Sequence, residues 1–271
     1  MSLKDVKFIA TDMDHTLLTE ASVLPPQFQE RLEALDRLGI QFGIASGRPL
    51  YTLQDIFPHD HQKLALICDN GGVISFRGQL ISKTLMPTAT VQEMVRVIRD
   101  ETDGLPLICG ITEAVGQTAD RQYDSVYREF YHRLSYLDDL TTWSGEADKV
   151  TIYLPNGDAR AVFDDVIAPR FGGQFSAAVS GPVWIDIMMP DINKGNGMRA
   201  IGKQMDITTD QMMAFGDNFN DAEMLKAVKY SYLVNNFAPG MEQFATYRTG
   251  TNEEYGVVQV LDQVIAAHRA Q

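Results

Sequence analysis

The sequence has little cysteine, no excess of positive charge and no long hydrophobic run. Only two of its 271 residues are cysteines, Cys68 and Cys109. Neither has a second cysteine or a histidine at ligand spacing, which argues against a disulfide framework and against a zinc site. Both cysteines are therefore expected to be small buried hydrophobic residues.

Acidic residues outnumber basic ones by 36 to 23, and the formal net charge is −13. The long-range field of such a protein opposes binding of nucleic acid and of anionic membrane surfaces, so we expect neither as a partner. No apolar run approaches the roughly eighteen residues that a membrane span needs, and residues 1–7 lack the apolar stretch of a signal peptide. These absences favour a soluble cytoplasmic protein.

Hydrophobic residues make up 45% of the chain, enough for a globular core. Near both ends of the chain, short apolar runs alternate with amphipathic stretches, the βαβ pattern that is typical of a parallel sheet. The predicted elements are strands at 6–10, 40–45, 64–68, 212–215 and near 232–234, and helices at 25–38, from 194, after 220 and up to about 267.

The pattern changes in the middle of the chain. Short runs around Arg77-Gly78 predict a hairpin, and from about residue 84 to 190 longer helices are interleaved with strands. The predicted helices lie at 90–101, 122–131 and 158–171, and the strands at 149–154, 175–179 and 183–188. We interpret this region as an inserted α+β domain.

Four loops carry the polar residues that a chemical reaction would need. Taken singly, each has an ordinary explanation, because aspartates form turns and serine caps helices. Ligands of open α/β sheets bind in the crevice outside the carboxyl ends of the strands, so loops that are distant in sequence can converge there. The residues are Asp12, Asp14 and Thr16, then Ser46 and Gly47, then Lys194, and finally Asp217, Asn220 and Asp221.

Their charges suggest what such a site would bind. Carboxylates brought together repel one another unless a cation lies among them, and Mg²⁺ prefers oxygen ligands. Lys194 opens a predicted helix, where a cation opposes the helix dipole unless an anion binds there too. The combination predicts a Mg²⁺ site that handles an anion.

Together these motifs resemble the haloacid dehalogenase superfamily of phosphohydrolases across nearly the whole chain, and more narrowly its Cof-type subfamily with a type IIB cap. The residues similar to its four motifs are Asp12–Leu18, Ser46, Lys194 and Gly216–Asp221, and the subfamily features are Ala45–Pro49, Asn70–Gly72 and Thr249–Val257. The resemblance implies an α/β fold, with a Rossmann-like parallel-sheet core from residues 1–82 and 191–271. An α+β cap at 83–190 would set substrate specificity.

The resemblance also implies a mechanism. Asp12 would attack phosphorus and form an aspartyl-phosphate, while Asp14 would protonate the leaving oxygen and then deprotonate the hydrolytic water. Mg²⁺ would be bound by Asp12, the main-chain carbonyl of Asp14 and Asp217, with Asp221 behind them. The expected reaction is hydrolysis of a small phosphomonoester, with sugar phosphates favoured.

The remaining residues receive supporting roles. Ser46, Gly47 and Lys194 would bind the phosphoryl group. Asn220 is expected to orient Lys194 or a metal ligand, and Thr16 to bond the loop backbone. Candidate substrate contacts are Arg48, Asn70, Gly71 and Asn193.

Two positions depart from the family pattern. His15 stands where the family usually has glycine, and its side chain could narrow the loop or reach the site. Residues 234–238 differ from the family's Met-Gly-Asn-Ala-like stretch, and we expect that loop to be peripheral to the chemistry.

Three other functions are compatible with parts of this pattern. A phosphosugar mutase would use the same aspartyl-phosphate and give an isomeric phosphate in place of free phosphate. A receiver-like phosphoacceptor also clusters acids around Mg²⁺, but it needs neither this length nor a cap. A non-catalytic phosphate-binding protein would not need the complete motif set. The physiological substrate and the oligomeric state are not indicated by the sequence.

Overall fold

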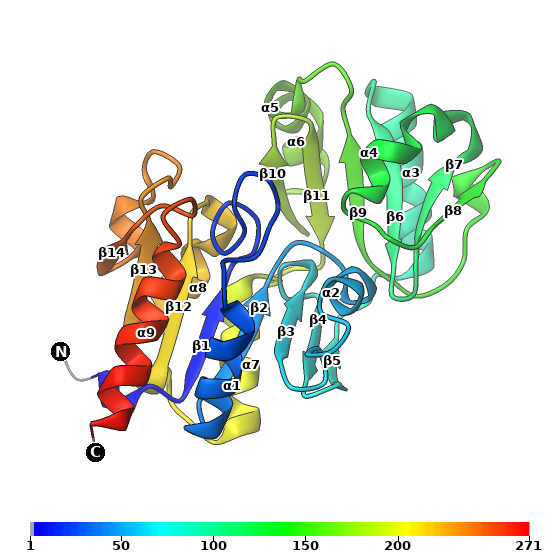
Figure 1. The fold of residues 1–271 in the computed structure, drawn as a ribbon. Helices are drawn as coiled ribbons and strands as arrows, with labels where there is room; N and C mark the ends of the chain where they lie inside the picture. Colours follow the sequence, from blue (N-terminus) through cyan, green and yellow to red (C-terminus); the bar gives the residue numbers. More distant parts are fainter. Residues whose placement is uncertain (1–2, 271) are drawn as a thin grey trace. The chain divides into compact units, whose positions relative to one another are not determined.

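The computed structural model describes residues 3–270, which form two units, each with its own sheet and hydrophobic core (Figure 1). The core unit comprises the chain up to Gly47, His59–Ile81 and the chain from Asn193 onward. The insert unit comprises Arg48–Pro58 and Ser82–Ile192. Among the described residues, no helix combines the length and the apolar content that crossing a bilayer requires.

The sheet of the core unit has eight strands in the order β14-β13-β12-β1-β2-β3-β4-β5. The pairs from β14 to β3 are parallel, and β4 is antiparallel to β3. Every residue of β1, β2, β3, β12 and β13 is buried, as expected for parallel strands covered on both faces. The bounds are β1 Phe8–Thr11, β2 Gln41–Ala45, β3 Ala65–Cys68, β4 Val73–Phe76, β5 Gln79–Lys83, β12 Met212–Gly216, β13 Tyr230–Val234 and β14 Tyr247–Thr249.

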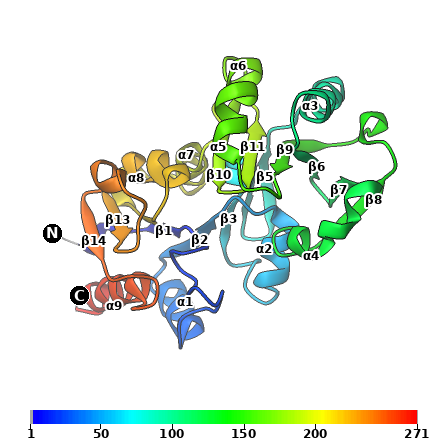
Figure 2. The same cartoon turned by 90° about the horizontal axis from the view of Figure 1, so that it is seen from above.

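Helices cover both faces of this sheet, which explains why its parallel strands are buried along their length. Helices α1 (Phe28–Arg37) and α9 (Gly256–Arg269) lie together on one face. Helices α7 (Lys194–Met205) and α8 (Ala222–Ala227) lie together on the other, as Figure 2 shows. The parallel α/β arrangement predicted for both ends of the chain is therefore confirmed.

The insert unit has a six-stranded sheet in the order β10-β11-β9-β6-β7-β8, antiparallel except for the parallel pair β7 and β8. The strands are β6 Leu105–Gly110, β7 Ala114–Gln117, β8 Leu134–Leu137, β9 Ala147–Tyr153, β10 Ser176–Gly181 and β11 Trp184–Met188. The helices are α2 Leu50–Ile56, α3 Thr88–Glu101, α4 Asp124–Arg128, α5 Ala159–Val162 and α6 Ala168–Phe171.

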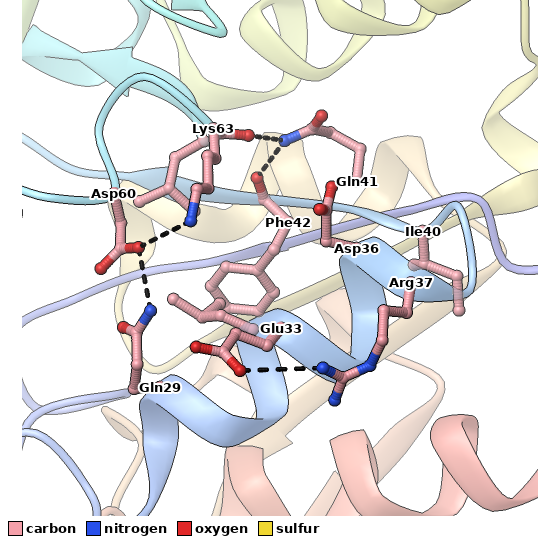
Figure 3. Close-up of a pocket in the computed structure, with 11 residues that line it drawn as sticks. Gln29, Glu33, Asp36, Arg37, Ile40, Gln41, Phe42, Asp60 and Lys63 are labelled. Atoms are coloured by element: carbon pink, nitrogen blue, oxygen red, sulfur yellow. Dashed lines mark hydrogen bonds and ion pairs between the residues drawn. The ribbon is translucent and has the colours of Figure 1, made fainter.

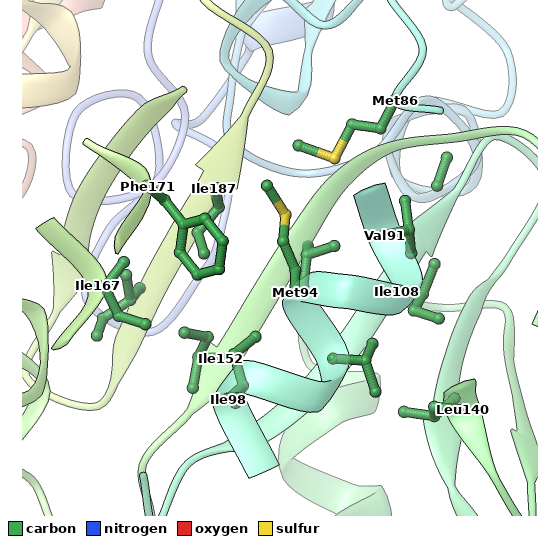
Figure 4. Packing of buried hydrophobic residues seen from close by; sticks show 14 of the residues in the cluster. Met86, Val91, Met94, Ile98, Ile108, Leu140, Ile152, Ile167, Phe171 and Ile187 are labelled. Carbon is green, nitrogen blue, oxygen red and sulfur yellow. The ribbon is translucent and has the colours of Figure 1, made fainter. Parts of the chain in front are cut away.

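Each face of the insert sheet has its own packing partners, because side chains alternate between the faces along a strand. Ile152 and Ile187 pack with Met94 and Phe171 in the aliphatic cluster seen in Figure 4. Alternate positions of the same strands join an aromatic cluster on the other face. That cluster contains Tyr51, Tyr127, Tyr131 and Tyr153, with the half-buried rings of Tyr123, Phe130 and Trp184 packed against it.

Several details of the insert unit differ from the sequence-based expectations. The predicted domain boundaries placed residues 48–58 in the core, whereas they group with the insert unit. The reason is that Tyr51 packs in the aromatic cluster and Thr52 Oγ1 donates to the Phe130 carbonyl at 3.0 Å.

The predicted helix at 122–131 is regular only over Asp124–Arg128. The predicted helix at 158–171 contains a π turn at Phe163–Ile167, next to Pro169, which has no N–H to donate to the helix. Strands β6, β7 and β8 were not predicted: β6 contains Pro106, which is unusual in a central strand, and β7 and β8 have only four residues each. Cys68 and Cys109 are buried and unbridged, as expected.

Candidate active site

The two acidic loops meet because their strands are neighbours. β1 pairs with β12 in parallel register, Thr11 opposite Phe215, and the Asp12 N–H donates to the Phe215 carbonyl at 2.9 Å. Asp12 and Asp217 therefore both begin their loops at the same edge of the sheet. Carboxylate oxygens of Asp12, Asp217 and Asp221 lie within 4.8 Å of one another, and all three side chains are buried.

Lys194 joins the two loops. It is the first residue of α7, whose preceding residue Asn193 caps the helix by accepting the Asn196 N–H. The Lys194 ammonium donates to Asp12 Oδ1 at 2.6 Å and to Asp221 Oδ1 at 2.7 Å. Its exposure is 0%, so this charge is neutralised by carboxylates and not by water.

Asp221 is held in place by backbone donors. Its Oδ2 accepts the Asp217 N–H at 2.9 Å and the Asn218 N–H at 3.2 Å. Gly216 permits this closure, because a Cβ on it would lie 2.5 Å from the Asp221 Cβ. With both oxygens occupied, Asp221 is suited to orienting Lys194 and the turn at Asp217.

Thr16 has a different partner from the expected one. Its Oγ1 donates to Asp217 Oδ1 at 2.8 Å, and not to the loop backbone. The adjacency of β1 and β12 brings the two loops within reach, which the sequence of either loop does not reveal. Thr16 thus fixes one oxygen of Asp217 and leaves the other available to a ligand.

The next group of candidate residues surrounds the end of β2. Ser46 is buried, and its carbonyl accepts the Asn70 N–H at 2.9 Å. Asn220 was expected to orient Lys194 or a metal ligand, but its amide donates to Asn70 Oδ1 at 3.2 Å. Gly47 lies beside the same Asn70 side chain. Asn70 therefore connects the loop after β2 to the loop after β12.

Gly71 and Asn193 also lie against each other. Gly71 has a φ of +109°, and a Cβ on it would lie 2.6 Å from the Asn193 carbonyl oxygen. Only glycine accommodates both this conformation and this approach.

Arg48 is the one candidate that belongs to the insert unit. Its Nη1 donates to the Glu129 carbonyl at 2.6 Å, and its guanidinium lies 5.1 Å from the centroid of the Phe130 ring. The structure thus places Arg48 among insert residues, whereas the other candidates belong to the core unit.

Burial and like charges disfavour the ionised carboxylates of this cluster. Burial raises the pKa of Asp12 well above its usual range, Lys194 opposes that shift, and the neighbouring aspartates reinforce it. Burial and the charge of Asp221 raise the pKa of Asp217 to about 6. Burial opposes the ammonium form of Lys194, but Asp12 and Asp221 outweigh it and raise the Lys194 pKa.

The cluster has the chemistry of a divalent cation site. Its three buried carboxylates face a single lysine, so a second cation would relieve the excess negative charge. Lys194 and Thr16 occupy Oδ1 of Asp12 and Asp217, which leaves Oδ2 of each carboxylate for that cation. Oxygen ligands of this kind suit Mg²⁺.

Two residues beside this site, Asn236 and Asn252, were not among the candidates predicted from the sequence. Asn236 Nδ2 donates to the His15 carbonyl at 2.7 Å, so the loop expected to be peripheral contacts the residue after Asp14. Asn252, only 2% exposed, donates to the Leu18 carbonyl at 3.0 Å. The sequence did offer a signal for Asn252, because it lies within residues 249–257, one of the segments that resemble the family. His15 itself has a φ of 59°, which explains why glycine suits this position.

A separate cavity of about 200 Å³ lies between α1 and β2 (Figure 3). Gln41, at the start of β2, lines it and donates to the carbonyls of Phe42 and Lys63. Ser46 follows the other end of the same strand, so this cavity is distinct from the acidic cluster.

The chain matches known proteins in both sequence and fold. The family model described as haloacid dehalogenase-like hydrolase matches residues 9–261. The chain is 27% identical to 5-amino-6-(5-phospho-D-ribitylamino)uracil phosphatase YbjI of Escherichia coli, over 96% of each chain. SMU.1108c of Streptococcus mutans has a similar structure, with a TM-score of 0.89, 27% identity, and 96% of this chain and 99% of that one covered. The subclass IIB sugar phosphatase BT4131 shares the fold, with a TM-score of 0.76, 20% identity, and 95% and 98% covered.

The raised pKa of Asp217 generates a testable expectation. A carboxyl whose pKa is raised on folding contributes stability below its unfolded pKa of about 4, and that contribution is lost as the pH rises through about 6. A cation bound to the carboxylates should restore it. We therefore expect saturating Mg²⁺ to raise the Tm more at about pH 7.5 than at about pH 5 in thermal unfolding.

Two variants control this measurement. Asp217→Asn should lose most of the Mg²⁺-dependent rise, because the ligand is removed. Asp36→Asn changes an exposed aspartate of α1 and should keep both the rise and its pH dependence. An equal Mg²⁺ effect at both pH values would contradict this account of the site.

Proposed function

This chain belongs to the haloacid dehalogenase-like hydrolase family and is a phosphoric monoester hydrolase, and we propose that it hydrolyses small phosphorylated metabolites in a Mg²⁺-dependent reaction. One observation carries the proposal: Lys194 is buried between Asp12 and Asp221, with Asp217 held beside them. This arrangement offers a nucleophilic carboxylate, a fixed cation for the phosphoryl group and oxygen ligands for a metal.

In the proposed first step, a carboxylate oxygen of Asp12 forms a bond to phosphorus while the bond from phosphorus to the ester oxygen breaks. Lys194 orients Asp12 and stabilises charge on the transferring group. Asp14, half-buried two residues further on, gives its proton to the leaving oxygen. The product is an alcohol and an aspartyl-phosphate.

In the second step, water attacks phosphorus and gives a proton to Asp14, and Asp12 is released with inorganic phosphate. Asp12 and Asp217 would hold the Mg²⁺, with the main-chain carbonyl of Asp14 as a further ligand, and Asp221 would orient the cluster. When bound, Mg²⁺ supplies charge stabilisation for the phosphoryl oxygens. Ser46 and Gly47 are proposed to bind that group, with Asn70 positioned by Asn220.

The function is tested by incubating the protein with a panel of phosphorylated metabolites. We expect phosphate release that EDTA abolishes and Mg²⁺ restores, with Ca²⁺ a poor substitute because it is larger and more loosely coordinated. An isomeric phosphate without free phosphate would indicate a mutase. A long-lived phospho-aspartate without turnover would indicate a phosphoacceptor, and full activity in the metal-stripped protein would refute the metal requirement.

The proposed roles of Asp12 and Asp14 can be separated by comparing substrates with different leaving groups. Asp12→Ala should lower kcat by several orders of magnitude for every substrate, since the covalent route is lost. Asp14→Asn should slow hydrolysis of alkyl phosphates strongly, by about 10²-fold or more. The leaving group of p-nitrophenyl phosphate needs little protonation, so with this substrate the first step of Asp14→Asn should be nearly as fast as in the wild type. The phospho-enzyme should then accumulate, and the leaving group should be released in a burst. Normal turnover by Asp12→Ala would refute the assignment.

We further propose that the insert unit selects the substrate. The core residues above would contact only the phosphoryl group, which every phosphomonoester shares. The insert unit itself carries half-buried rings, with Phe130 and Trp184 in edge contact at 5.5 Å between centroids and Arg48 over the Phe130 ring. YbjI is named for a substrate in which a phosphorylated ribityl chain carries a uracil ring. Phosphorylated polyols that bear a heterocycle are therefore the first candidates, ahead of simple sugar phosphates.

This selection predicts a change of substrate ranking. Phe130→Leu should lower kcat/KM about two- to tenfold for the ribitylamino-uracil phosphate relative to ribose 5-phosphate, the range expected for one aromatic contact. Phe171→Leu is the matched control, because Phe171 packs in the aliphatic cluster on the other face of the insert sheet. Mg²⁺ dependence should stay constant. An unchanged ranking in Phe130→Leu would count against selection by these rings.

A further inference from the structure

The turn that follows Asp14 is enclosed by hydrogen bonds that the proposed chemistry does not use. Three segments of the core unit meet there: residues 15–20 after β1, Asn236 after β13, and Asn252 between β14 and α9. None of the side chains in this contact was assigned a role above. All the contacts lie within the core unit.

The hydrogen bonds form a closed ring that begins and ends at His15. His15 Nδ1 pairs with Glu20 Oε1 at 3.1 Å, and the same oxygen accepts from Asn252 Nδ2 at 3.0 Å. The Asn252 N–H donates to Asn236 Oδ1 at 3.0 Å. Asn236 Nδ2 then donates to the His15 carbonyl at 2.7 Å, which closes the ring.

The two asparagines also restrain the main chain of the turn. Asn252 Nδ2 donates to the Leu18 carbonyl at 3.0 Å, and its side chain is almost completely buried in a loop. His15 has a left-handed backbone conformation, with a φ of 59°. A residue other than glycine keeps such a conformation only where its surroundings over-determine it. Asn236 and Asn252 provide that restraint.

Asp12 and Asp14 are held by different means. The Asp12 backbone is part of the sheet, and its side chain is bound by Lys194. Asp14 comes after the last strand residue, and the turn that follows it is tied to Asn236 through the His15 carbonyl and to Asp217 through the Thr16 hydroxyl. Loosening the ring should therefore disturb Asp14 and leave Asp12 in place.

We propose that Asn252 and Asn236 are positioning residues that hold the turn at His15 and thereby aim Asp14 at the leaving oxygen. The inference rests on the proposed function, in which Asp14 is the acid and base. It also gives His15 a use in this chain, because its side chain adds the link to Glu20 that completes the ring. The loop after β13 then helps to position Asp14 through the hydrogen bond from Asn236 to the His15 carbonyl.

The test compares two leaving groups in Asn252→Ala with Mg²⁺ present. For an alkyl phosphate such as ribose 5-phosphate, kcat should fall about ten- to a hundredfold, the range for a misplaced catalytic group. For p-nitrophenyl phosphate, the phosphorylation rate should fall less than about threefold, because little protonation is needed. KM should change little for either substrate. A general loss of folded protein would lower both rates equally, and that result would overturn the proposal.

Gln41→Ala is the matched control. Gln41 is also a buried amide that donates to two backbone carbonyls, but it lies at the start of β2, beside the cavity of Figure 3. It should lower the Tm without changing the ratio of the two rates. If Gln41→Ala shifts the ratio as much as Asn252→Ala does, the ring has no special role.

A second measurement is independent of turnover. Amide hydrogen exchange of the full-length protein should become faster in residues 14–22 of Asn252→Ala, with β1 and α7 unchanged. Unchanged exchange in residues 14–22 would refute the proposal that the ring holds the turn, even if the variant is an active enzyme. If the wild-type protein releases no phosphate from any ester, the proposed function fails, and the exchange comparison still decides whether the ring holds the turn.

Discussion

The charge of Lys194 has no access to water, and the arrangement of the site depends on how that charge is compensated. A buried ammonium is stable only among groups of opposite charge, and Asp12 and Asp221 supply them from two distant loops. The compensation is more than complete, because Asp217 adds a third buried carboxylate. In the proposed function, this surplus negative charge would bind the metal ion and the lysine would bind the phosphoryl group.

The parallel sheet makes this compensation possible. β1 and β12 are neighbours, so the loops that follow them open at the same edge of the sheet. Helix α7, on one face of the sheet, begins with Lys194, whose ammonium reaches Asp12 at that edge. The Asp221 side chain at Gly216 and the Asn193 backbone at Gly71 then approach so closely that only hydrogen fits in place of a side chain. The positions of most of these groups thus follow from strand order, while the turn after Asp14 is also restrained by the side chains of Asn236 and Asn252.

Much of the core unit could be predicted from sequence, and less of the insert unit. Mostly apolar runs such as residues 40–45 and 212–215 identify buried parallel strands, because such strands are covered on both faces. Strands β7 and β8 are short and only partly apolar, so their pairing depends on neighbours that a local pattern does not contain. Residues 48–58 show the same limit. The hydrophobic periodicity did not reveal helix α2, and Tyr51 of that helix lies among the aromatic rings because of long-range packing.

By itself, the sequence determined which residues could perform the chemistry, since carboxylate, hydroxyl and lysine side chains after apolar strands are recognisable in one dimension. It did not determine the partners of those residues. Thr16 binding to Asp217, Asn220 binding to Asn70, and the ring through Asn236 and Asn252 all join loops distant in sequence. Only the tertiary structure decided these contacts, because a hydrogen bond depends on a distance of about 3 Å, and that distance is set by how the strands between the loops are ordered.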